Sequence, residues 1–187
     1  MPSNEGMEPS DIAPKRDLLH APWRLEYLES LGGAESPPDS GEASSFLEAS
    51  WRDPGADEAN HVIVRTGVGL IMLNRYPYAN GHLLAFLGEG RPTLIDYEPA
   101  QRADLWKLVE LATDLMQRTL EPQGINIGIN QGRAAGAGVP QHLHVHLVPR
   151  WGGDVNFMEV VGQVRVIPSS LEAMAARYRA VWQDMVG

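Results

Sequence analysis

Three histidines at alternate positions, His142, His144 and His146, are the residues of this sequence best suited to do chemistry. Strict alternation of polar and apolar residues is typical of a half-buried strand, which would place the three imidazoles on one face with neighbours ~6.5 Å apart. That spacing suits contact with successive atoms of one bound ligand. The residues expected on the opposite face, pointing into a core, are Leu143, Val145 and Leu147.

Such a row of imidazoles has two chemical interpretations. Neutral imidazole is the commonest zinc ligand in proteins. It can also attack phosphorus as a nucleophile while neighbouring groups donate hydrogen bonds to phosphate oxygens. An ordinary histidine pKa of ~6.5 keeps the attacking form dominant at neutral pH. From the histidines alone, both interpretations are open.

The surroundings of the histidines favour phosphate over zinc. The preceding loop, residues 131–141, is rich in glycine and alanine, so its backbone can approach a ligand closely and point N–H groups at phosphate oxygens. The chain has no cysteine, and residues 124–153 contain no Asp or Glu to complete a hydrolytic zinc site. Because three histidines can bind zinc unaided, the metal site is disfavoured and not excluded.

The composition limits the class of protein. The chain has 187 residues, of which 43% are hydrophobic and 21% charged, as expected for a globular protein with a sizeable core. Its net charge of −9 offers no basic surface to a nucleic acid polymer, whereas a small anion needs only local donors. No apolar run is long enough for a membrane span, and the N-terminus lacks the features of a signal peptide. We therefore expect no membrane association and a cytoplasmic location.

The elements that must position the histidines form an α+β pattern. Apolar runs bounded by turn residues predict five strands, at residues 61–66, 70–74, 82–87, 125–130 and 141–150. Short connections between the first three predict an antiparallel meander. The three- and four-residue spacing of apolar residues predicts a long helix over 98–120 and a C-terminal helix over 171–186. We expect a five-stranded antiparallel sheet with one long helix between strands 3 and 4 and a C-terminal helix.

The domain organisation follows from the same pattern. Proline, glycine and acidic residues near the N-terminus predict a flexible arm and linker over 1–45, with a short helix or ordered segment within 18–31. We expect the catalytic domain over 46–170, opening with one or two helical turns, and a helix at 171–187 packed on that domain.

The residues around the histidines resemble a known family. Gln141 to Val148, three histidines alternating with apolar residues, resembles the motif of the histidine triad (HIT) family of nucleotide hydrolases and transferases. Further resemblances lie in the preceding loop, Asn130-Gln131-Gly132 with Ala135-Gly136, and in the nucleoside-binding strand pair, Leu73-Asn74-Arg75 with Pro77 and Gly81-His82. The flanks Pro22-Trp23-Arg24 and Pro149 to Asp154 are similar to the bacterial branch whose characterised members act on diadenosine tetraphosphate, some as phosphorylases.

This resemblance implies a covalent mechanism. It makes His144 the nucleophile that attacks the α-phosphorus and forms a nucleotidyl-histidine, which water or inorganic phosphate then resolves. His142 would hold the geometry of the row, and His146 would contact the phosphate or the leaving group.

The resemblance also implies a set of substrate-binding residues. His82 would lie near the same phosphates, Asn74 would meet the ribose, and Asn130 would lie beside the phosphate or the nucleophile. Many relatives place a glutamine directly after the Ala-Gly of the loop, and this chain does not. We therefore assign phosphate binding in the loop to Gly136, Ala137, Gly138 and Gln141.

Some relatives carry a cysteine pair for structural zinc where this chain has Ser44 to Leu47, so we expect no metal and no cofactor. The expected substrate is a small adenine nucleotide or dinucleoside polyphosphate. Alternatives are an adenosine phosphoramidate hydrolase and a nucleotide-binding sensor with little turnover. The resemblance also implies a homodimer or higher homo-oligomer, for which Trp23, Trp151 and Trp182 are candidate contact residues.

Overall fold

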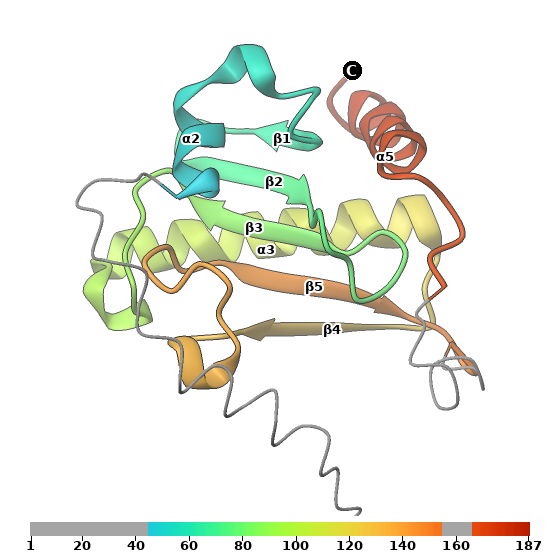
Figure 1. Ribbon diagram of the computed structural model, residues 1–187. Coiled ribbons are helices and arrows are strands. Elements are labelled where there is room, and N and C mark those ends of the chain that lie inside the picture. Colours follow the sequence, from blue (N-terminus) through green and yellow to red (C-terminus); the bar gives the residue numbers. More distant parts are fainter. Residues whose placement is uncertain (1–44, 155–165) are drawn as a thin grey trace, which may run out of the picture. The chain divides into compact units, whose positions relative to one another are not determined.

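A computed structural model describes residues 45–154 and 166–187. These residues carry a short helix, three strands, a long helix, two more strands and a final helix (Figure 1). In order they are α2 (Phe46–Arg52), β1 (Val62–Arg65), β2 (Gly69–Leu73), β3 (Leu83–Leu87), α3 (Pro99–Leu120), β4 (Gly124–Ile129), β5 (Val145–Arg150) and α5 (Leu171–Val186). The predicted arm and linker lie outside the described residues, except for Ser45.

The strands form one antiparallel sheet in the order β1-β2-β3-β5-β4. The first three strands make the predicted meander, and α3 then carries the chain to the far edge, so that β5 lies between β3 and β4 (Figure 1). The predicted α+β fold is confirmed, with strand ends shifted by a residue or so. The largest difference is in the last strand, which begins at Val145 and not at Gln141.

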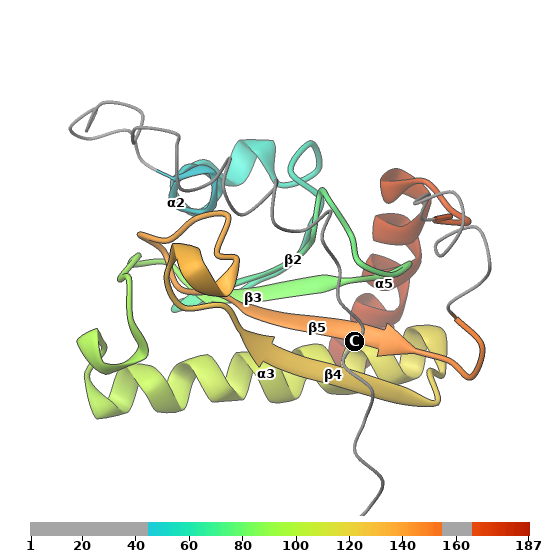
Figure 2. The same ribbon diagram turned by 60° about the horizontal axis from the view of Figure 1, so that its bottom comes forward.

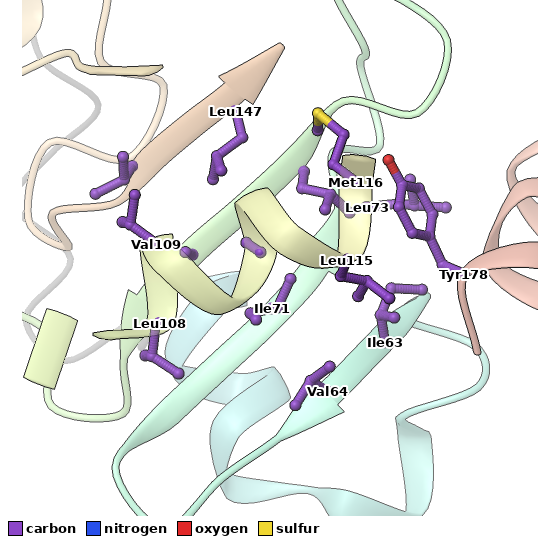
Figure 3. Close-up of a cluster of buried hydrophobic side chains, with 14 of the residues drawn as sticks. Ile63, Val64, Ile71, Leu73, Leu108, Val109, Leu115, Met116, Leu147 and Tyr178 are labelled. Atoms are coloured by element: carbon purple, nitrogen blue, oxygen red, sulfur yellow. The ribbon is translucent and has the colours of Figure 1, made fainter. Parts of the chain in front are cut away.

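Helix α3 lies where the sequence predicts it because its ends are well specified. Proline occupies the first turn, and Glu98 and Gln101 form a reciprocal capping box. The helix ends at Glu121, which takes a left-handed conformation with φ 48°. One stripe of the helix is buried against the sheet: Leu105, Leu108, Val109, Ala112, Leu115 and Met116. Figure 3 labels four of them, Leu108, Val109, Leu115 and Met116.

Different helices pack on the two faces of the sheet (Figure 2). One face packs against α3 and α5 and forms the larger apolar cluster (Figure 3). This cluster contains Leu143, Val145 and Leu147 as predicted. Leu84 and Phe86 of β3 point to the other face, which is covered by Leu47 and Trp51 of α2. The α2 side therefore carries the histidine face of β5, because side chains alternate along a strand.

Helix α5 is hydrogen-bonded to the loop that precedes β3. Its Tyr178 is fully buried, and the phenol donates a hydrogen bond of 2.8 Å to the carbonyl of Gly81. Burial raises the pKa of Tyr178 far above its ordinary value, so the phenol stays a donor. In the parts of the chain that the structure describes, none of the helices has the length and apolar character needed to cross a membrane.

Gly69, the first residue of β2, tests the packing between the sheet and α3. A Cβ at this position would lie 2.1 Å from the carbonyl oxygen of Phe86 and 2.8 Å from Cδ1 of Leu108. We expect Gly69→Ala to lower the free energy of unfolding by about 1–3 kcal/mol, measured by urea unfolding. Gly67→Ala is the matched control because no atom lies within 4 Å of its added Cβ. Equal losses in the two variants would contradict this account.

Candidate active site

The three histidines lie at the start of β5, but only His146 belongs to the strand. Pairing between β3 and β5 ends at Ala85 and Val145. The backbone N–H of Leu143 instead donates to the carbonyl of Arg91, in the loop after β3, at 2.8 Å. The predicted strand over 141–150 is thus too long at its N-terminal end, because Leu143 bonds to the loop after β3 and not to a neighbouring strand. The alternation of side chains persists through them, with Leu143 buried in the core.

Both ring nitrogens of His142 form hydrogen bonds within the protein. Its Nε2 lies 2.8 Å from the carbonyl oxygen of Leu87, which can only accept, so Nε2 carries the proton. Its Nδ1 lies 3.1 Å from the hydroxyl of Ser45, which donates to it. The side chain is buried, and burial lowers its pKa, so His142 is neutral at neutral pH. It has no nitrogen left for a ligand.

His144 has one nitrogen held and one available. Its Nδ1 lies 2.9 Å from the carbonyl oxygen of His142 and must donate to it. In the neutral ring this leaves Nε2 without a proton, and burial lowers the pKa of His144, which favours that neutral ring. No other group of the described residues hydrogen-bonds to Nε2. The lone pair that a nucleophile needs is therefore present at neutral pH.

His146 also has Nε2 available to a ligand, but in the protonated form. The backbone N–H of Tyr78 donates to Nδ1 of His82 at 3.1 Å, so His82 carries its proton on Nε2. That Nε2–H donates to Nδ1 of His146 at 3.0 Å. The proton of His146 must then lie on its own Nε2, a buried atom without a partner in the described parts of the chain. Burial lowers the pKa of His146 to about 4, and the second cause is repulsion from His144 when that ring is protonated.

The two available nitrogens are complementary. The rings of His144 and His146 are 4.9 Å apart between centroids, and one offers a lone pair where the other offers an N–H. This arrangement can attack an electrophilic phosphorus and donate to one of its oxygens at the same time. It suits a metal ion poorly, because an ion needs lone pairs and only His144 presents one. Within residues 45–154 and 166–187, no group of three His, Asp or Glu side chains is placed to hold a metal.

The remaining predicted site residues on the sheet are engaged with one another. His82 is fully buried, so it acts on the site through His146 in this conformation. Asn74 accepts the backbone N–H of Tyr76 at 3.0 Å and places its amide nitrogen 3.3 Å from Nδ1 of His82. The predicted contacts of His82 with phosphate and of Asn74 with ribose stay predictions.

The glycine-rich loop folds back on itself beside Asn130. The backbone N–H of Gly136 donates to the carbonyl of Arg133 at 2.9 Å, and that of Ala137 donates to Gly132 at 3.2 Å. Neither N–H is free for a phosphate in this conformation. Gly138 and Gln141 are exposed and form no hydrogen bond with the described residues, so they are the loop donors that remain available.

Two residues near the histidines were not predicted from the sequence. Ser45 bonds to His142 although 97 positions separate them. The ring of Tyr78 is stacked on that of His146, with centroids 5.7 Å apart and an angle of 24° between the planes. Tyr78 lies four positions before His82, and this short distance was a usable signal. For Ser45 the one signal was its place in the segment where some relatives carry a cysteine pair.

Comparison with known proteins identifies the family of this chain. Residues 56–153 match the HIT domain family. The chain is 35% identical to an AP-4-A phosphorylase of Mycobacterium tuberculosis over 82% of this chain and 77% of that protein. It is 31% identical to a bis(5'-nucleosyl)-tetraphosphatase (asymmetrical) of Schizosaccharomyces pombe over 54% and 56% of the two chains. A zinc-bound histidine triad family protein of Mycobacterium smegmatis superposes with a TM-score of 0.63 at 26% identity, covering 78% of this chain and 98% of that one.

The neutral histidines predict a stability that depends on pH. An unfolded histidine takes up its proton near pH 6.5, whereas the folded pKa of His146 is about 4. The unfolded chain therefore binds more protons between these values, and the free energy of unfolding should fall as the pH falls through that window. We expect the free energy of unfolding of His146→Gln, measured in urea, to change less between pH 6.5 and 4.5 than that of the unaltered chain. His61→Gln, outside the triad, is the control, and an equal reduction in both variants would contradict the assignment.

Proposed function

We propose that this chain, which belongs to the HIT domain family, is an enzyme that breaks a nucleoside phosphoanhydride bond through a covalent nucleotidyl-histidine at His144. Membership of the family and the enzymatic relatives support the class of reaction. One observation carries the mechanism: the unprotonated Nε2 of His144 lies beside the protonated Nε2 of His146.

The first step forms a bond between Nε2 of His144 and the α-phosphorus. The bond between that phosphorus and the bridging oxygen breaks, and the leaving nucleoside polyphosphate takes the electron pair. His144 becomes positively charged in this step, and the carbonyl of His142 stabilises that charge because it already accepts the Nδ1–H. The Nε2–H of His146 donates to a phosphate oxygen or to the leaving oxygen, where negative charge develops.

The second step returns the enzyme to its starting state. The oxygen of water or of inorganic phosphate attacks the same phosphorus, the P–N bond breaks, and His144 regains its lone pair. When water is the acceptor, its proton passes to the solvent. The imidazole of His144 is a good leaving group because it departs as a neutral ring. The two acceptors differ only in their products, so the geometry of the histidines serves both.

The proposed substrate is a dinucleoside tetraphosphate such as diadenosine tetraphosphate. The names of two relatives, a phosphorylase of AP-4-A and a nucleosyl tetraphosphatase, support this substrate. The chain has a net charge of −9, so local donors must hold the polyphosphate. We assign this role to His146, Gly138 and Gln141, with Asn130 at the base of the same loop.

A homodimer is also proposed, through the open edge of the sheet. Strand β4 is an edge strand, and every one of its residues is exposed or half-exposed. An unpaired strand edge of this kind is a template for pairing with a second chain. The exposed side chain of Ile127 on that strand adds apolar area to such a contact.

The products of diadenosine tetraphosphate identify the second acceptor. We expect ATP in every case, together with AMP if water resolves the intermediate and ADP if inorganic phosphate does. The measurement is chromatographic separation of products with and without added phosphate. Two molecules of ADP formed without phosphate would place the cleavage at the centre of the polyphosphate and would contradict attack on the α-phosphorus. Adenosine phosphoramidate, tested in parallel, shows whether a P–N bond is the better substrate.

Replacement of His144 tests covalent catalysis. We expect His144→Ala to lower kcat by at least ~10³-fold, because among the three histidines of the triad only His144 has an available nitrogen with a lone pair. Binding of AMP, measured by calorimetry, should persist. Mass spectrometry after quenching in alkali, in which P–N bonds survive, should find a nucleotidyl adduct on the unaltered enzyme and none on His144→Ala. His61→Ala is the control, and an adduct on another residue would overturn the assignment.

A further inference from the structure

We propose that Ser45 is a positioning residue for the histidine triad, acting on His144 through His142. Its hydroxyl oxygen lies 3.1 Å from Nδ1 of His142, in a buried setting. The same oxygen accepts the backbone N–H of Glu48 at 3.1 Å, as the N-cap of α2. With one lone pair occupied in this way, the hydroxyl proton is directed to the imidazole.

The direction of this hydrogen bond follows from the other side of the ring. Nε2 of His142 donates to the carbonyl of Leu87, so Nδ1 can only accept while the ring is neutral. Ser45 is the sole donor to Nδ1 among the described residues. Without it, a buried acceptor would be left unpaired, which is a costly state in a protein interior.

Packing holds the His142 ring from the remaining sides. Phe86 meets it edge-on, with centroids 5.2 Å apart. Gly90 leaves room for it, since a Cβ there would lie 2.8 Å from Cγ of His142. The ring therefore has one orientation as long as both of its nitrogens are bonded, and the Ser45 hydroxyl supplies one of these two bonds.

His142 passes its position on to the nucleophile through its own main chain. Its carbonyl accepts the Nδ1–H of His144 at 2.9 Å, the bond that leaves Nε2 of His144 unprotonated. If the His142 ring tilts or flips, the main chain at this residue loses an anchor. A shift of its carbonyl would then loosen both the rotamer and the tautomer of His144. Ser45 touches no reacting atom itself, so its loss should affect turnover more than substrate affinity.

Ser45 is held in place independently of the histidines. Arg65 of β1 donates to the carbonyls of Trp51 and Ser50, at 2.8 and 2.7 Å, and so fixes the C-terminal end of α2. Leu47 in the first turn of the helix is fully buried. Because α2 is held at both ends, the Ser45 hydroxyl has a fixed position relative to His142, as a positioning residue requires.

Glycine substitutions separate the donor role of Ser45 from its capping role. Glycine is nearly as good an N-cap as serine, so Ser45→Gly removes the hydroxyl at little cost to α2. The matched control is Ser170→Gly, because Ser170 caps α5 by accepting the N–H of Ala173 at 3.2 Å. Ser45→Thr restores a hydroxyl at the same position. All variants are studied in the full-length chain.

The first readout is steady-state turnover of diadenosine tetraphosphate, which rests on the proposed function. We expect Ser45→Gly to lower kcat about 10-fold with little change in KM, as for other residues that orient a reacting group. Ser45→Thr should recover most of this loss, and Ser170→Gly should behave as the unaltered enzyme. An unchanged kcat in Ser45→Gly would overturn the proposal, as would a loss of the same size in Ser170→Gly.

The second readout does not need turnover. Imidazole ¹⁵N spectra should show Nδ1 of His142 losing its hydrogen-bonded shift in Ser45→Gly, and His144 changing from one tautomer to a mixture. Unchanged His144 signals in that variant would overturn the proposal. If no variant acts on the tetraphosphate but the His144 signals respond as expected, the positioning role stands and the proposed substrate fails.

Discussion

The hydrogen bond from Nδ1–H of His144 to the carbonyl of His142 is the interaction on which the candidate site depends. It decides which nitrogen of His144 is free, and it places an acceptor where positive charge develops during attack. A backbone carbonyl is suited to this task because it cannot titrate. The site therefore needs no buried carboxylate to orient its nucleophile, and residues 124–153 contain none.

The fold forms this bond because the apolar residues and the histidines of the motif pack on opposite faces of the sheet. Leu143, Val145 and Leu147 are buried against α3 and tie the segment to the core of the sheet. The histidines face the α2 side, where the rings of His142 and His146 meet partners from distant parts of the chain. His142 is held by β3 and α2, and His146 is held by His82 at the start of β3. Burial of the apolar half supplies the stability that lets the polar half be held in one arrangement.

The triad is electrically neutral in a protein with a net charge of −9, so neither offers positive charge to an anionic substrate. Burial lowers the pKa of all three histidines, so none relies on positive charge to hold an anionic substrate. Oriented N–H groups do that work, and the donor at Nε2 of His146 is oriented by a chain of hydrogen bonds that begins at the backbone of Tyr78. Such preorganised dipoles stabilise developing charge without reorganising during the reaction.

The sequence by itself determined the class of fold and the identity of the central residues, because both depend on local periodicity. Alternation placed Leu143 and Val145 in the core, and the spacing of apolar residues located α3 and α5. Only the tertiary structure decided which nitrogen of each histidine is available and where β5 begins. Those features depend on partners distant in the chain: Ser45 and Leu87 for His142, His82 for His146, and Arg91 for Leu143. A one-dimensional pattern specifies which face a side chain occupies, whereas its hydrogen-bond partner is set by what the folded chain brings to that face.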